Sequence, residues 1–221
     1  MRCLLVDPED TAQVFVILRS LSSSRAFNRL FSRVMTDPTG RKALAERPPL
    51  VQLLEDREYL QSLPPESLGW AYARFCLNEN LRADGLAEPS QVMEDAYLSP
   101  SARRLAERLR DSHDLWHVVT GYGRDLLGEG ALLAFTYAQI RNNGLAFISL
   151  MGVLKLRRSG HRHAAAVVWD GYRRGRAAGL MPAAEWETLL ERPLEEVRRG
   201  FGLPRPAAYE AVRTEEMPGL S

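Results

Sequence analysis

The chain has 221 residues, of which 45% are hydrophobic and 26% charged, and these values are typical of one globular domain with a full hydrophobic core. The formal net charge of +1 excludes a strong global field toward a polyanion, so we expect no nucleic-acid partner. The two cysteines, Cys3 and Cys76, exclude a disulfide framework. Nearly all cations are arginine, a coding bias that indicates a GC-rich bacterial genome.

Two observations argue against a secretory or membrane-spanning segment. Residues 7–10 are acidic or proline and interrupt any apolar run near the N-terminus. The most apolar window, 131–150, carries Gln139, Arg141 and Asn142 in its middle, and a charge at a bilayer centre costs about 2.5–3.5 kcal/mol on insertion scales. We therefore expect no signal peptide and no transmembrane helix. The expected location is peripheral, on the cytoplasmic side of a bacterial membrane.

The first half of the chain predicts helices separated by turns. Apolar residues at helical spacing predict a long helix over residues 11–35, and the Asp-Pro-Thr-Gly sequence at 37–40 predicts a turn. A short helix is predicted to follow and to end before Pro48. A third helix is predicted to start near residues 64–66. Its inward stripe is formed by Leu68, Tyr72, Phe75 and Cys76.

The second half of the chain continues the helical pattern. Residues 78–89 are polar and rich in turn formers, and Ser99 followed by Pro100 predicts a helix start. That helix is predicted to end near Gly121. Further helices are predicted over 128–140, 144–156, 162–178 and 183–190.

Strand signals are scarce throughout, and no linker is polar enough to divide the chain. The sequence therefore predicts an all-α fold, a single-domain helical bundle over residues 1–221, with a loosely ordered tail at 204–221.

One short motif carries the residues best suited to chemistry. It contains His113, Asp114 and His117, followed after eleven residues by Glu129. Residues i and i+4 of a helix lie on one face with Cβ atoms roughly 5–6 Å apart, so both imidazoles can face one ion. A glycine break at 121–123 lets the chain reverse and bring Glu129 alongside. The motif therefore predicts a divalent-metal site made by these four residues.

The apolar stripe upstream of the motif predicts that the histidines are buried. Leu105 and Leu109 are followed at the same spacing by His113 and His117. A buried polar group without a partner costs roughly 1–3 kcal/mol, and one metal ion would satisfy the imidazoles and carboxylates together. The simpler interpretation is a pair of core histidines bonded to backbone. The neighbouring carboxylates make a metal site the better interpretation.

Two nitrogen and two carboxylate donors form a mixed ligand set. Zinc is the expected ion, and iron(II) or manganese would also fit. Two known metal motifs do not match. The zincin motif needs glutamate where Asp114 stands, and the HD-type phosphohydrolases need an upstream histidine, whereas His113 is the first histidine in the chain. A metal-dependent hydrolase is therefore the weaker interpretation.

The motif and its surroundings resemble the Coq-four family of ubiquinone (coenzyme Q) biosynthesis proteins. The resemblance covers roughly Phe27 to Leu203 and keeps all four motif positions. It rests on the blocks HDLWHVVTG and LLGEGALLAF, on DPTGRKALAERPPL and LPPESLGWAYARF upstream, and on WDGYRRGRAAGL and WETLLERPLEEVRRGFGL downstream.

The resemblance implies an α-helical, often dimeric protein that binds a divalent metal, usually taken to be zinc. It implies peripheral membrane association and contact with other ubiquinone-biosynthesis enzymes. It also implies oxidative decarboxylation of a prenylated 4-hydroxybenzoate precursor, in which the C1 carboxylate is replaced by hydroxyl. His113, His117 and Glu129 are then the firmest ligands, Asp114 is a fourth ligand or the proton-transfer group, and Glu129 is the other candidate catalytic carboxylate. The alternative is a non-catalytic lipid-binding scaffold that organises the pathway enzymes.

Two further features have both a plain and a functional interpretation, and a third has a plain one only. The apolar stretch 132–156 predicts helix-packing core, or else a wall for a polyprenyl tail. The arginines between 157 and 176 predict a solvated face, or else contact with anionic lipid headgroups. Packing anchors are predicted at Trp70, Trp169 and Trp186.

Overall fold

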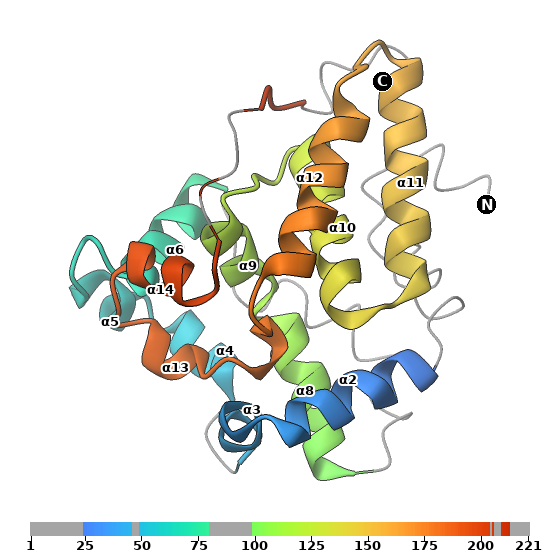
Figure 1. Ribbon diagram of the computed structural model, residues 1–221. Coiled ribbons are helices and arrows are strands. Elements are labelled where there is room, and N and C mark those ends of the chain that lie inside the picture. Colours follow the sequence, from blue (N-terminus) through green and yellow to red (C-terminus); the bar gives the residue numbers. More distant parts are fainter. Residues whose placement is uncertain (1–23, 46–48, 80–98, 204, 206–208, 213–221) are drawn as a thin grey trace. The chain divides into compact units, whose positions relative to one another are not determined.

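The computed structural model describes residues 24–45, 49–79, 99–203, 205 and 209–212. Every regular element within these residues is a helix, so the predicted all-α fold class is confirmed (Figure 1). The helix predicted over 11–35 is described from Ser24 onward as α2 (Ser24–Thr36), and its earlier part lies outside the described residues.

The chain divides into two compact units, and the boundary falls inside α2. The hairpin unit comprises residues 1–28, 122–177 and 206–221. The histidine unit comprises residues 29–121 and 178–205. The interpretation of residues 1–221 as a single domain stays a prediction.

Three long helices form the hairpin unit and lie side by side in Figure 1. They are α10 (Leu126–Ile140), α11 (Asn143–Arg158) and α12 (Ala164–Ala177). Arg141 ends α10 in a left-handed conformation with φ of 58°, and the side chain of Asn142 caps α11 by accepting from Gly144 N at 2.8 Å. This two-residue connection makes α10 and α11 a helical hairpin.

Helix α12 packs closely on α10 through two glycines spaced four residues apart, Gly171 and Gly175. A methyl group at Gly171 would overlap the carbonyl of Ala131, and one at Gly175 would overlap that of Phe135. The close approach also lets Gln139 Nε2 donate to the carbonyl oxygen of Gly175 at 2.6 Å. The packing of these helices therefore requires that both positions lack a side chain.

The histidine unit is built mainly from short helices. They are α3 (Pro38–Ala43), α4 (Leu50–Glu55), α5 (Arg57–Ser62), α6 (Leu68–Asn78), α8 (Pro100–Asp111), α9 (His113–Thr120), the 3-10 helix η3 (Met181–Ala183), α13 (Trp186–Leu189) and α14 (Leu194–Gly200). Helices this short are marginal alone, so they depend on caps and on tertiary contacts. Side-chain caps come from Asp37, Asp56, Ser67 and Ser99.

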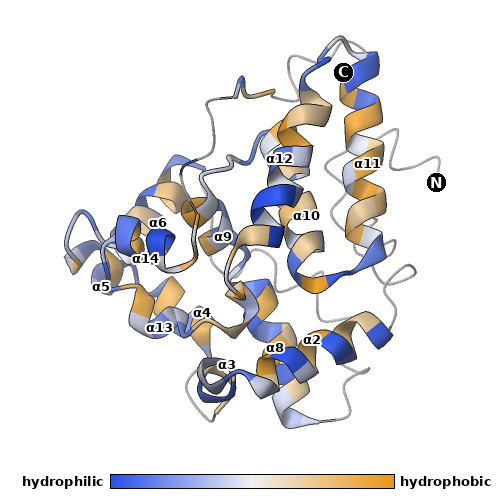
Figure 2. Ribbon diagram, viewed as in Figure 1, coloured by the Kyte–Doolittle hydropathy of each residue, from blue (hydrophilic) through white to orange (hydrophobic). Residues whose placement is uncertain are grey.

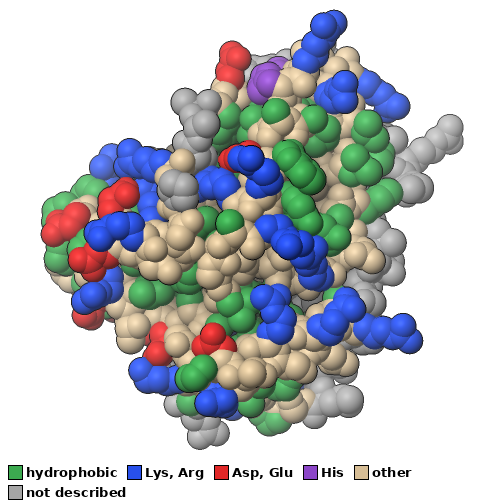
Figure 3. Space-filling view, viewed as in Figure 1, with side chains coloured by type: hydrophobic (Ala, Val, Ile, Leu, Met, Phe, Trp, Pro, Cys, Tyr) green, Lys and Arg blue, Asp and Glu red, His purple; other side chains and the backbone are tan. Residues whose placement is uncertain are grey.

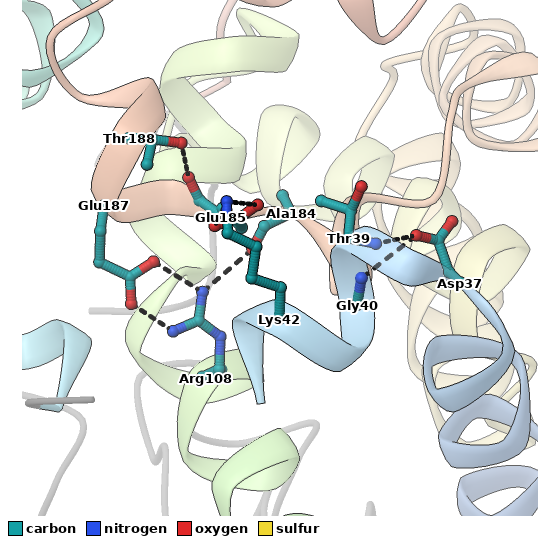
Figure 4. A network of polar contacts seen from close by, with 9 residues as sticks. All are labelled: Asp37, Thr39, Gly40, Lys42, Arg108, Ala184, Glu185, Glu187 and Thr188. Atoms are coloured by element: carbon teal, nitrogen blue, oxygen red, sulfur yellow. Dashed lines mark hydrogen bonds and ion pairs between the residues drawn. The ribbon is translucent and has the colours of Figure 1, made fainter. Parts of the chain in front are cut away.

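A polar network joins α3, α8 and the segment around α13 (Figure 4). The guanidinium of Arg108 donates to Glu187 Oε1 at 2.5 Å and Oε2 at 3.0 Å, and to the carbonyl of Ala184 at 3.0 Å. Lys42 Nζ lies 2.9 Å from a carboxylate oxygen of Glu185. Because a buried guanidinium is costly without such partners, Arg108 holds α8 firmly in this unit.

Apolar residues run along α10 and α11, whereas the C-terminal end of α11 is hydrophilic (Figure 2). No helix among the described residues is both long enough and apolar enough to span a membrane.

Two local predictions are wrong. The helix predicted from Ser99 to Gly121 divides at Ser112 into α8 and α9, and Ser112 N–H bonds back to the carbonyls of Arg108 and Arg110. The turn predicted at 37–40 is a helix start, because the carboxylate of Asp37 accepts from two backbone N–H groups and caps α3.

The three predicted tryptophan anchors differ in burial: Trp186 is buried, Trp70 is half-buried and Trp169 is exposed. Trp186 is 1% exposed and confirms its role as a packing anchor. Trp169 is 60% exposed, so the same prediction is wrong there. The reason is helical periodicity: α12 buries its glycine face, and Trp169 lies two residues before Gly171, about 200° around the helix.

Candidate metal centre

Helix α9 carries three of the four predicted ligands, and local sequence defines where it begins and ends. The carbonyl of Ser112 accepts the first helical bond, from Trp116 N at 3.1 Å. Gly121 ends the helix with φ of 79°, in the left-handed region that favours glycine, and its N–H donates to His117 O at 2.8 Å. His117 therefore lies in the last turn of α9.

His113 and His117 lie one turn apart. Their ring centroids are 5.0 Å apart with planes at 73°, and one ring nitrogen of each lies within 4.8 Å of the other. His117 is 1% exposed, whereas the side chain of His113 is 34% exposed. The predicted inward orientation is therefore confirmed for His117 and only in part for His113.

This pair fits a divalent ion. Two nitrogens bound to one tetrahedral zinc ion stand about 3.4 Å apart, given Zn–N bonds of about 2.0–2.1 Å. The ring nitrogens lie 4.8 Å or less apart, a separation close to that value. The partly exposed ring of His113 gives the pair access to solvent.

Asp114 makes an orienting contact. Its Oδ1 lies 3.3 Å from Nδ1 of His113. A carboxylate at one ring nitrogen fixes the orientation of an imidazole and leaves Nε2 to face an ion, an arrangement common around histidine ligands. Asp114 also lies in the first turn of α9, where the helix dipole favours a negative charge. This contact adds a third role to the roles of ligand and base.

Helix α6 forms a wall against α9. The ring of Phe75 stacks on His117 with centroids 5.7 Å apart and planes at 22°. Burial raises the pKa of Tyr72 above its usual range, and Cys76 and the carboxylate of Asp114 raise it further. The helical spacing of Tyr72 and Phe75 predicts that both lie on an inward stripe. The sequence carries no other signal that connects these two residues to the histidine motif.

Glu129 belongs to the hairpin unit and lies in the first turn of α10, whose N-cap is Asp125. One carboxylate oxygen lies 3.6 Å from Nε of Arg124, and the side chain is 31% exposed. The structure brings together His113, Asp114 and His117 on one helix, while the role of Glu129 as a ligand stays a prediction.

A clasp of hydrogen bonds holds the start of α10. Tyr209 Oη donates to Asp125 Oδ2 at 2.7 Å and accepts from Gly123 N at 2.9 Å. The N–H of Val212 donates to Asp125 Oδ1 at 3.0 Å, and its carbonyl accepts from Leu126 N at 2.8 Å. Residues 209–212, which the sequence assigns to a loosely ordered tail, are thus bonded to the cap of the helix that carries Glu129.

A separate pocket of about 200 Å³ lies in the histidine unit against α8. Its polar lining consists of Arg104, Glu107, Arg108 and Asp111, and it contains no histidine. The candidate site on α9 therefore does not coincide with this cavity.

The comparisons with known proteins agree on one family. The sequence profile described as "Coenzyme Q (ubiquinone) biosynthesis protein Coq4" matches residues 3–207, which include the whole motif. A crystal structure from Nostoc punctiforme, of a chain assigned to ubiquinone biosynthesis, superposes with a TM-score of 0.63 at 20% identity and covers 88% of this chain and 89% of that one. At that identity the likeness concerns the fold alone.

Fungal relatives carry the same description. The chain is 30% identical over 190 residues to the mitochondrial ubiquinone biosynthesis protein COQ4 of Arthroderma otae, covering 84% of this chain and 67% of the relative. It is 27% identical over 212 residues to the corresponding protein of Meyerozyma guilliermondii, covering 95% and 66%. It spans 61% of the Podospora anserina protein. Although the chain spans only about two thirds of the length of these relatives, it belongs to the Coq4 family of coenzyme Q (ubiquinone) biosynthesis proteins.

Proposed function

We propose that this chain is a metal-dependent enzyme of ubiquinone biosynthesis. Its reaction replaces the carboxylate at ring carbon 1 of a prenylated 4-hydroxybenzoate precursor with a hydroxyl group. The observation that carries the proposal is the imidazole pair of His113 and His117 on α9, with Asp114 at the ring of His113. Family membership supplies the pathway.

The proposed ligands are His113, His117 and Glu129, with Asp114 either orienting His113 or joining them. Residues 121–124 alone separate α9 from the N-cap of α10, and Glu129 lies one turn into α10. This short connection supports the participation of Glu129. Zinc is the expected ion, and iron(II) or manganese would accept the same donors.

In the proposed reaction the carbon–carbon bond to the carboxylate breaks, carbon dioxide leaves, and water supplies the new hydroxyl group. Dioxygen, the oxidant, accepts the two electrons and two protons that are released and becomes hydrogen peroxide. A bound divalent cation would stabilise negative charge on the substrate carboxylate or phenolate. Asp114 and Glu129 are the carboxylates that can accept a proton from the ring hydroxyl. Burial raises the pKa of Tyr72 above its usual range, so its phenol stays protonated well above neutral pH and can donate a hydrogen bond at this wall of the site.

The hairpin unit offers a surface for the prenyl tail and the membrane. Exposed apolar side chains occur on α11 and α12, namely Leu150, Leu154 and Trp169. Figure 3 shows hydrophobic side chains gathered over these helices, with cationic side chains at the borders. This combination of apolar, aromatic and cationic groups suits the interface of an anionic bilayer, so we propose peripheral attachment there. The expected membrane is bacterial, on its cytoplasmic side.

The same exposed face favours a second function. A non-catalytic scaffold would bind the prenyl lipid through the hairpin unit and present it to other ubiquinone-biosynthesis enzymes. The metal would then stabilise the short helix α9 without contacting substrate. Other pathway enzymes and a second copy of this chain, as a homodimer, are the expected protein partners in either case.

One experiment separates the two functions. The purified chain is loaded with Zn²⁺, Fe²⁺ or Mn²⁺ and incubated with prenylated 4-hydroxybenzoate and dioxygen, and the hydroxylated product is quantified. Product formation by the wild type, lost in His117→Ala and kept in His161→Ala, supports the enzyme. Lipid binding without product under every metal would reject the enzyme and leave the scaffold.

A further inference from the structure

A buried arginine in the histidine unit contacts the end of α9. Arg198, on α14, is 7% exposed. Its Nε donates to the carbonyl oxygen of Val119 at 3.0 Å and its Nη2 to that of Val118 at 2.9 Å. Its Nη1 lies 2.7 Å from Glu195 Oε1 on the same helix. One guanidinium thus binds two consecutive backbone carbonyls of the histidine-bearing helix.

Those two carbonyls are among the groups that a helix leaves unpaired at its C-terminus. The carbonyl of His117 accepts from Gly121 N, and that of Trp116 accepts from the hydroxyl of Thr120 at 2.7 Å. Arg198 satisfies the next two. The fork of the guanidinium, with N–H groups in a fixed plane, matches two adjacent acceptors in a way that a lysine ammonium does not.

The arginine is itself attached to the element that supports His117. Leu194 N, at the start of α14, donates to Glu66 O at 2.8 Å, and Leu68 N, at the start of α6, donates to Arg192 O at 2.9 Å. Helix α6 carries Phe75, which stacks on the ring of His117. The ring of His117 is therefore held by α6, while the backbone that follows it is held by Arg198.

We propose that Arg198 is a positioning residue of the metal centre, acting through the backbone of α9. It fixes the last turn of this eight-residue helix so that His117 faces His113 at ligand distance. The proposal rests on the metal-binding function proposed above. The bonds of Arg198 go to backbone carbonyls of α9 and to Glu195, so its proposed effect is on the geometry of the ligand pair.

The test uses Co²⁺, which stands in for zinc and reports its ligands by absorption. Co²⁺ affinity and spectrum are measured for Arg198→Met, Arg198→Lys and the matched control Arg199→Met, whose side chain is exposed on the same helix. We expect Arg198→Met to bind about 10–100-fold more weakly, as is usual when a group supporting a metal ligand is lost, and the control to match the wild type. Arg198→Lys should fall between them, since it keeps the charge and loses the fork.

A double-variant cycle separates positioning from plain destabilisation. At a temperature where all variants are folded, Arg198→Lys should weaken Co²⁺ binding in the wild type and have little further effect in His117→Ala. Equal weakening of Co²⁺ binding in the wild-type and His117→Ala backgrounds would overturn the proposal. So would Co²⁺ affinities of the two 198 variants equal to that of the Arg199→Met control.

If the wild type binds no Co²⁺, the metal function fails. Hydrogen exchange then still tests positioning, which is contradicted if residues 113–121 exchange equally in the 198 and 199 variants.

Discussion

The hairpin unit and the histidine unit hold their helices together in different ways. In the hairpin unit, α10 and α12 meet backbone to backbone at Gly171 and Gly175. In the histidine unit, short helices are joined by side chains that reach backbone or carboxylate groups far along the chain, such as Arg108 and Arg198.

The difference shows which substitutions each unit tolerates. Close helix packing depends on the absence of atoms, so added volume should be the damaging change in the hairpin unit. Bonds from buried arginines depend on specific donors, so loss of a donor should be the damaging change in the histidine unit. The helix that carries the candidate metal ligands, α9, is therefore held by a distant polar residue, Arg198, as well as by the packing of Phe75 on His117.

The largest expected effect is that of added volume between α10 and α12. In Gly171→Val the new side chain meets the carbonyl of Ala131, which cannot move without displacing α10. We expect the free energy of unfolding to fall by about 3 kcal/mol or more in urea titrations. Gly152→Ala is the control, because a Cβ there meets no atom within 4 Å and should stabilise α11 by up to about 1 kcal/mol. A midpoint unchanged by Gly171→Val would contradict the close packing.

The next effect is the loss of a buried donor in the histidine unit. Arg108→Met removes the guanidinium that pairs with Glu187, and we expect a loss of about 3 kcal/mol, measured by urea unfolding. Adding Glu187→Gln should restore part of that loss, because it replaces the buried carboxylate that has lost its partner with a neutral amide. If the double variant is as unstable as the sum of the two single variants, the pair does not act as a unit.

A smaller effect is expected at the clasp on α10. Tyr209→Phe removes the bonds to Asp125 and Gly123 and should cost about 1–2 kcal/mol, with faster hydrogen exchange at the start of α10. Tyr59→Phe, which removes only an exposed bond to Glu191, should change stability by less than about 0.5 kcal/mol. Equal effects of the two substitutions would show that the Tyr209 hydroxyl adds nothing to the clasp.

The smallest expected effect is a pH dependence of the free energy of unfolding that comes from Asp111. Burial raises the pKa of Asp111, although Arg110 and Arg108 act to lower it. A carboxyl whose pKa is higher in the folded state contributes stability at low pH that is lost as the pH rises through that pKa. The stability of Asp111→Asn relative to the wild type should therefore increase between about pH 4 and neutral pH. A difference that stays constant, or that changes in the opposite direction, would contradict the shift.

Local signals in the sequence predicted much of the fold. Ser99 with Pro100 marked the start of α8, and Gly121 marked the end of α9, because caps are set by a few neighbouring residues. Histidines four residues apart likewise predicted a shared face on one helix, which α9 confirms.

The remaining features depend on partners distant in sequence. Arg198 lies 79 residues from Val119, and Tyr209 lies 84 residues from Asp125, so no local pattern could pair them. The break at Ser112 was also missed, because the apolar spacing on either side of it remains helical. Sequence therefore predicted that the two candidate histidine ligands share one face of α9, whereas the distant residues that contact this helix had no local signal.

Zinc binding is the sharpest measurement of whether α9 holds a metal ion. Equilibrium dialysis against buffered Zn²⁺ compares the wild type with His113→Ala and His117→Ala, and with His161→Ala as a control outside the motif. We predict about one zinc per chain in the wild type and the control, and at least roughly 100-fold weaker binding in the two motif variants. Equal zinc content in all four proteins would contradict metal binding by α9.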